Sequence, residues 1–104
     1  MQVEETGVLF RKWRDASEVI ALFPAIPADL FGMYTLSYER LGQHGGADFH
    51  LVVGATRPAT HAEASSLAEE LDRIGYTLRP IKRASRKVHE ARRAEARRIR
   101  LQHK

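Results

Sequence analysis

Residues 60–75 constrain the fold most, because their pattern specifies a helix from its first residue to its last. Thr60 and Glu63 have the spacing of a capping box, in which each side chain binds the other residue's backbone amide. Apolar residues then recur at intervals of three and four, which places them on one helical face: Ala64, Leu67, Ala68, Leu71 and Ile74. Gly75 is the residue type that most often ends a helix. Such a helix needs a second apolar surface to cover its face.

The residues before this helix predict β-strands that can supply that surface. Alternating apolar and aromatic residues favour three strands, at residues 8–13, 18–23 and 33–41. Pro24 and Pro27 are expected to end the second strand, since proline lacks the amide hydrogen that a sheet requires. After the helix, residues 76–81 predict a strand at a sheet edge, because Pro80 has the same defect.

Together these segments predict one α+β domain in residues 1–83. A small antiparallel sheet, made of the three N-terminal strands and the later edge strand, is packed by the helix at residues 60–74. Residues 49–53 fit either a short strand or a helix, and we favour the helix because Asp48 is a good N-cap. The expected core contains Val8, Phe10, Val19, Ile20, Leu22, Tyr34, Leu36, Leu67, Leu71, Ile74 and Leu78.

Charge is segregated along the chain. Residues 79–104 hold eleven Lys or Arg and two Glu, a net charge of +9, while the rest of the chain has a net charge of −5. Residues 84–104 are rich in alanine, arginine and glutamate, which are strong helix formers. They predict an Arg-rich helical tail with a thin packing face of Val88, Ala91 and Ile99, which either projects from the domain or frays.

This basic tail predicts contact with nucleic acid. Each Lys or Arg that neutralises a phosphate releases counterions, which gives affinity without sequence specificity. A membrane surface is not expected as a partner, because the face opposite the arginines lacks bulky apolar residues. A protein partner with an acidic surface remains open. The residues expected to bind nucleic acid are Arg83, Arg86, Lys87, Arg92, Arg93, Arg97, Arg98 and Arg100.

Residues 42–48 are the other candidate site. Three glycines in five residues predict a tight loop that carries polar side chains. His44 is suited to general acid or base work near neutral pH, with Asp48 to orient it. Tyr38 and Arg40 precede the loop and could contact a phosphate. The alternative is a structural turn whose polar groups bond only to nearby carbonyls.

Metal binding is a weaker variant of the same hypothesis. His44, Asp48 and His50, with His61 further along the chain, are residue types that zinc accepts. Their spacing matches no standard ligand motif, so we expect neither a metal nor a cofactor.

The chain has no cysteine, its first residues are acidic, and its longest apolar run, residues 19–23, is too short to cross a membrane. A cytoplasmic protein is the simplest expectation.

Several strings in residues 8–83 resemble a family of small uncharacterised bacterial proteins, some of them borne on mobile elements. The most specific is Gly-Gln-His-Gly-x-Ala-Asp at residues 42–48. Residues 19–29, Ser37-Tyr38, residues 56–59 and Gly75-Tyr76 carry the rest. The resemblance implies a single bacterial domain and no particular activity, and it does not include the basic tail.

The sequence therefore favours a non-enzymatic accessory module that associates with nucleic acid through its C-terminal helix. One alternative is a small hydrolase or nuclease that uses His44 and Asp48. Another is a protein-interaction module of a mobile element.

Overall fold

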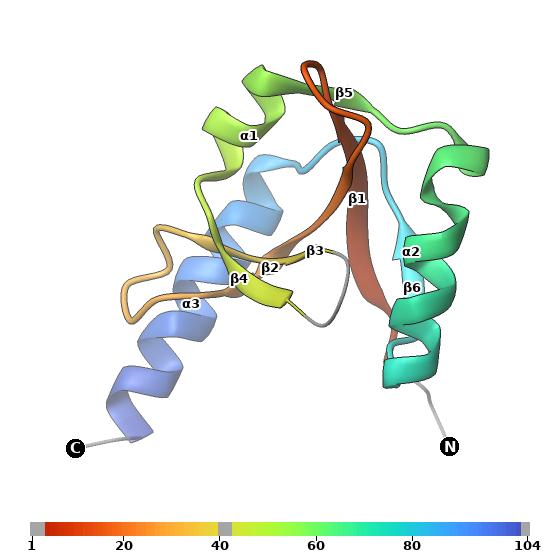
Figure 1. Ribbon diagram of the computed structural model, residues 1–104. Helices are drawn as coiled ribbons and strands as arrows, with labels where there is room; N and C mark the ends of the chain where they lie inside the picture. The colour runs from red at the N-terminus through yellow and green to blue at the C-terminus, as the bar shows by residue number, and fades with distance from the viewer. Residues whose placement is uncertain (1–3, 40–42, 103–104) are drawn as a thin grey trace.

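The computed structural model describes residues 4–39 and 43–102. Within those ranges, six strands form one sheet and three helices pack against it (Figure 1). The strands are β1 (Thr6–Trp13), β2 (Val19–Pro27), β3 (Thr35–Glu39), β4 (Gln43–Ala47), β5 (Thr56–Pro58) and β6 (Leu78–Pro80). The helices are α1 (Phe49–Ala55), α2 (His61–Ile74) and α3 (Arg86–Gln102). The predicted α+β class is confirmed.

The sheet has the order β4-β3-β2-β1-β5, and all of these neighbours are antiparallel. The strand predicted after α2 is confirmed as the short β6, but it pairs parallel to β1. β5 pairs with β1 at residues 11–13 and β6 pairs with it at residues 6–8. The two short strands therefore share one side of β1, while β2 occupies the other side.

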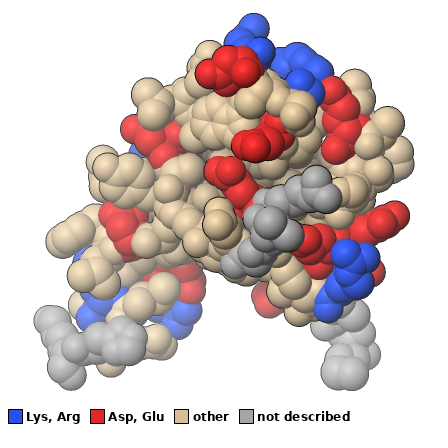
Figure 2. Space-filling view, viewed as in Figure 1, with Lys and Arg blue, Asp and Glu red and all other residues tan. Residues whose placement is uncertain are grey.

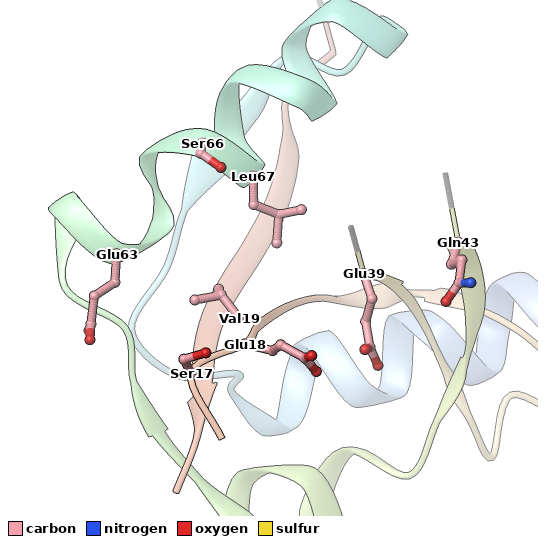
Figure 3. Close-up of a pocket in the computed structure, with 8 residues that line it drawn as sticks. All are labelled: Ser17, Glu18, Val19, Glu39, Gln43, Glu63, Ser66 and Leu67. Atoms are coloured by element: carbon pink, nitrogen blue, oxygen red, sulfur yellow. The ribbon is translucent and has the colours of Figure 1, made fainter. Parts of the chain in front are cut away.

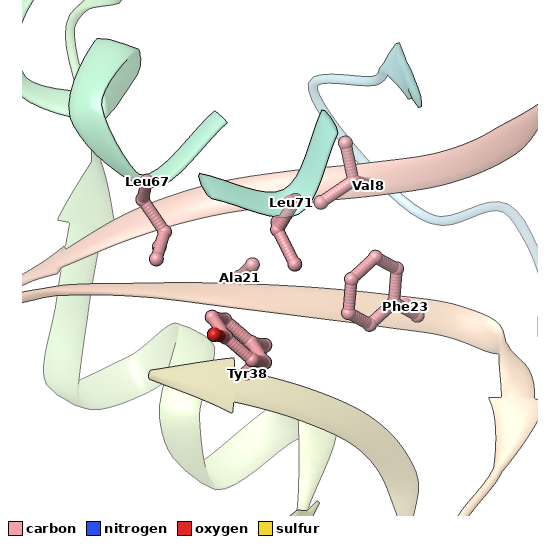
Figure 4. Close-up of a cluster of buried hydrophobic side chains, with 6 residues drawn as sticks. All are labelled: Val8, Ala21, Phe23, Tyr38, Leu67 and Leu71. Atoms are coloured by element: carbon pink, nitrogen blue, oxygen red, sulfur yellow. The ribbon is translucent and has the colours of Figure 1, made fainter. Parts of the chain in front are cut away.

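One face of the sheet packs against α2. Every second side chain of these strands points to this face. These side chains meet the apolar stripe of α2 and form one buried cluster with it (Figure 4). Its members are Val8, Ala21, Phe23, Tyr38, Leu67 and Leu71. The sequence predicted this helix correctly, including its capping box, in which Glu63 N–H donates to Thr60 Oγ1 over 3.2 Å.

The opposite face packs against α1 and α3. Leu9, Ile20 and Leu22 meet Phe49 and Val52 of α1 in a second buried cluster. The helix preferred for residues 49–53 is confirmed, and Asp48 caps it by accepting a 3.2 Å hydrogen bond from Leu51 N–H. Because helices cover both faces, the sheet forms the middle layer of the domain.

Two strand predictions were wrong. β2 does not end at Phe23 but continues to Pro27, with a register shift between these residues. This shift lets the strand pass its prolines, and the buried Pro24 offers its carbonyl to a side chain instead. Residues 56–58, where no strand was expected, form β5. Arg11 holds them in place, since its guanidinium donates to Thr56 Oγ1 over 2.9 Å and to the Thr56 carbonyl over 3.0 Å.

Two of the expected core residues, Tyr34 and Ile74, are exposed. Tyr34 precedes β3 rather than belonging to it, and Ile74 is the last residue of α2. One lies just before an element and the other at the end of one, so the strand and helix patterns overestimate their burial. The other predicted core positions are buried or partly buried.

Helix α3 packs against β2 and does not project as a free arm. Its fully buried positions are His89, Arg92 and Ala96, whereas the expected packing residues Val88 and Ile99 are partly buried and Ala91 is exposed. No helix in residues 4–39 or 43–102 is both long and apolar enough to cross a membrane.

Candidate functional site

The glycine-rich segment is a strand rather than the expected loop. Residues 43–47 form β4 and pair antiparallel with β3, with His44 directly opposite Tyr38. The two rings lie edge to face with centroids 4.7 Å apart. β4 is the edge strand of the sheet, and its residues Gly45 and Gly46 carry no side chain.

His44 has a partner that the sequence did not indicate. Its Nε2 lies 2.9 Å from the hydroxyl of Tyr76, in the segment between α2 and β6. The Tyr76 ring stacks on Phe23 with centroids 4.9 Å apart, and burial raises the pKa of its hydroxyl. This contact joins residues 32 positions apart, and no local pattern marks such a pair. His44 is thus held by two tyrosines.

Of the residues proposed to act with His44, Tyr38 lies against its ring, whereas Asp48 lies further along the chain. Asp48 caps α1, and the intervening strand places its Cα about 13 Å from that of His44, at roughly 3.3 Å per residue. Tyr38 is only 1% exposed. Arg40 lies outside the described residues. Among the described residues, no three His, Asp or Glu side chains are arranged to hold a metal ion. The candidates His44, Asp48, His50 and His61 therefore form no such group.

A cavity of about 320 Å³ lies beside β4 and α2, and acidic side chains line it. Figure 3 shows the carboxylates of Glu18 and Glu39 turned toward the same space, with Gln43 next to them. Glu63 also lines it, and hydrogen bonds from Arg57, at 2.6 Å, and from Thr60 N–H lower the pKa of Glu63 to about 2. Figure 2 shows Asp and Glu spread across this face of the molecule, with Lys and Arg mainly near its edges. Such a surface repels phosphate.

The arginines predicted to bind nucleic acid fall into two groups. Arg92 is 3% exposed and works inside the fold, where Nε donates to the Gly32 carbonyl and Nη1 donates to the Pro24 carbonyl, both over 2.9 Å. We therefore leave Arg92 out of the candidate surface. The other predicted residues are exposed or partly exposed: Arg83, Arg86, Lys87, Arg93, Arg97, Arg98 and Arg100.

Two of these cations have acidic partners on α3. Arg86 bonds Glu90 over 3.1 Å, and Arg98 bonds Glu95 in a pair that raises the pKa of Arg98. In the described part of the chain, Arg93 and Arg97 have no ion pair or hydrogen-bond partner. They are four residues apart, so they project from the same side of α3.

The segment between β2 and β3 lies beside this side of α3. The Gly32 backbone is so close to α3 that a Cβ built on it would lie 2.9 Å from the Cα of Arg93. Arg100 donates to the Leu30 carbonyl, and its guanidinium carbon lies 4.8 Å from the centroid of the Phe31 ring. The sequence did not indicate this neighbourhood, because its members are some 60 to 70 residues apart.

No protein-family model, curated protein or solved structure matches this chain. The resemblance to small bacterial proteins therefore stays a prediction. The candidate site rests on the geometry of α3 and its neighbours.

Proposed function

We propose that this protein is a non-enzymatic module that associates with nucleic acid through the exposed cations of α3. The observation that carries the proposal is the docking of α3 through Arg92. Because the buried guanidinium fixes the helix on β2, the remaining cations are presented on a rigid surface. A preorganised surface loses less conformational entropy on binding than a frayed tail does.

The charge of α3 is sufficient for such contacts. Residues 86–102 include seven Lys or Arg and two Glu, and only Arg92 of the seven is buried. The exposed pairs Arg86–Glu90 and Arg98–Glu95 are of a kind that stabilises proteins by only about 0–1 kcal/mol, so phosphate can replace the carboxylate. Arginine is also well suited to bidentate contacts with phosphate.

A hydrolase at His44 is less well supported. The only ring nitrogen of His44 with a described partner bonds Tyr76, while Asp48 is occupied at the start of α1. The nearby cavity is acidic, which disfavours a phosphate-containing substrate. We therefore propose no reaction for this region.

The test is the binding of labelled single-stranded and duplex oligonucleotides to the full chain and to the double variant Arg93→Gln/Arg97→Gln. The matched control is Arg73→Gln/Arg79→Gln, which removes the same charge from exposed positions outside α3. We expect the first variant to bind at least about tenfold more weakly and the control to bind like the wild type. Equal losses in both variants would mean that only net charge matters, and no binding by the wild type would refute the proposal.

A further inference from the structure

We infer that the segment between β2 and β3 is a stacking surface that makes the protein prefer single-stranded nucleic acid. This inference rests on the proposed function and names the substrate class of the same site. The surface, here called the apolar loop, comprises residues 30–34: Leu30, Phe31, Gly32, Met33 and Tyr34.

The apolar loop exposes large side chains that a folded protein normally buries. Leu30 is 64% exposed, Phe31 63% and Met33 65%, and Tyr34 is about half exposed. Four large apolar or aromatic side chains thus lie within five consecutive residues at the surface. Exposed apolar residues that occur singly need no explanation, but a contiguous patch marks an interaction site.

The apolar loop is also held rigidly. The carboxylate of Asp29 accepts from Tyr34 N–H over 2.9 Å and from Phe31 N–H over 3.4 Å. Ala28 N–H donates to the Tyr34 carbonyl over 3.0 Å, which closes the base of the loop. Arg92 binds the Gly32 carbonyl from α3. The backbone that carries the exposed rings is therefore held in place before any partner arrives.

The apolar loop lies beside α3. Arg100 covers one face of the Phe31 ring, and the backbone of Arg93 lies against Gly32. Because Phe31 remains largely exposed, a base can stack on the ring while neighbouring phosphates contact Arg93 and Arg97. Grooves that bind single strands combine these two elements, aromatic rings for bases and cations for the backbone.

A single strand fits this surface better than a duplex does. Bases in a duplex are already stacked on each other and present only their edges, so Phe31 and Tyr34 would gain little from them. Unpaired bases of any sequence have a free face for an aromatic ring. The arginines alone would bind both forms, and the rings supply the preference.

The experiment compares the affinities of a labelled oligothymidylate and a duplex of equal length for the full chain and for single variants. We expect Phe31→Ala to weaken single-strand binding by roughly 5- to 150-fold and Tyr34→Ala to weaken it less, with duplex binding unchanged within about twofold. Phe31→Trp should retain single-strand binding, because it keeps a ring. The matched control is Leu51→Ala on α1, which removes a similarly exposed apolar side chain (71%) that is not part of the apolar loop.

The outcomes separate this inference from the proposed function. If the wild type binds both oligonucleotides equally and Phe31→Ala has no effect, the stacking surface is refuted and the role of α3 stands. If the wild type binds neither, both fail. The same variants are tested for sedimentation with phosphatidylserine vesicles and for self-association. An effect of Phe31→Ala on either of these, without an effect on the oligothymidylate, would overturn the inference in favour of a lipid surface or a second copy.

Discussion

The guanidinium of Arg92 donates a 2.9 Å hydrogen bond from Nε to the carbonyl of Gly32, and this bond joins α3 to the segment between β2 and β3. The same side chain reaches the Pro24 carbonyl and the Nδ1 atom of His89, at 2.9 and 2.7 Å. Burial lowers the pKa of Arg92, and no carboxylate lies within ion-pair distance of it among the described residues. Three hydrogen bonds therefore replace an acidic partner.

Replacing Arg92 should destabilise the protein. Arg92→Met keeps much of the aliphatic stem but leaves two buried carbonyls without a donor, and each unpaired group costs about 1–3 kcal/mol. We expect the free energy of unfolding to fall by about 2–4 kcal/mol in urea denaturation. The neighbouring Arg93→Met, at an exposed position, should change it by less than about 0.5 kcal/mol. Equal effects of the two substitutions would contradict the anchoring role of Arg92.

The close approach of Gly32 to α3 predicts a second stability difference. Gly32 has φ of 72°, and an added Cβ would lie 2.9 Å from Arg93 Cα and 3.1 Å from the Arg92 carbonyl oxygen. Gly32→Ala should therefore destabilise the fold by more than about 1–2 kcal/mol. Gly54→Ala in α1 is the control, because a Cβ added there would have no neighbouring atom within 4 Å. We expect this substitution to stabilise the protein by about 0.5–1 kcal/mol, since alanine favours a helix more than glycine does. Thermal unfolding of the pair should give shifts of opposite sign.

His89 predicts that stability depends on pH. Burial lowers the pKa of His89, and the positive charges of Arg92 and Arg93 and the nearby His50 ring lower it further. The unfolded chain therefore takes up this proton first, so the contribution is fully present above about pH 6.5 and is lost as the pH falls below that value.

The comparison between the wild type and His89→Gln isolates this contribution, because the two proteins differ only at residue 89. Glutamine can still accept a hydrogen bond from Arg92. We expect the difference in unfolding free energy between the two proteins to shift in favour of the variant between about pH 6.5 and 5. A difference that does not change with pH would show that His89 has no titration linked to folding.

Removing α3 should destabilise the rest of the chain. A protein that ends at Arg83 lacks the ring of His89, which lies edge to face on Phe49 at 4.7 Å, and lacks the donor to Pro24. We expect the truncated chain to bind a hydrophobic dye and to unfold at lower urea concentration than the full chain. If residues 1–83 unfold at the same urea concentration with or without α3, the helix is an independent tail, as the sequence suggested.

Local chemistry explains the parts of the fold that the sequence predicted correctly. Thr60 and Glu63 bond each other's amides within one helical turn, and Asp48 caps α1 in the same local way. Neither contact depends on distant parts of the chain. The core positions Val8, Leu67 and Leu71 were also evident, because alternation in strands and the helical repeat reflect the faces that are buried.

The errors in the fold have tertiary causes. β2 passes Pro24 through a register shift, and Arg92, 68 residues later, donates to the Pro24 carbonyl. Residues 56–58 form a strand because Arg11 binds them. A prediction from neighbouring residues cannot include these contacts, because Arg92 and Arg11 are distant in sequence from the segments they bind.

The candidate surface was predicted only in part. The exposed cations of α3 follow from composition, but the sequence also included Arg92, whose burial depends on the positions of Pro24 and Gly32. The apolar loop was missed because the sequence placed Met33 and Tyr34 in a strand, with Tyr34 in the core. Its exposure follows from the Asp29 turn and from the contact of Gly32 with α3.

The salt dependence of binding tests the central claim most directly. The logarithm of the association constant for oligothymidylate is measured against the logarithm of the salt concentration for the wild type and for Arg93→Gln/Arg97→Gln. If both arginines contact phosphates, the slope of the double variant should be smaller in magnitude by about 1.4, since each single-strand phosphate contact contributes about 0.7. An unchanged slope, or a wild-type protein that does not bind at low salt, would contradict the account.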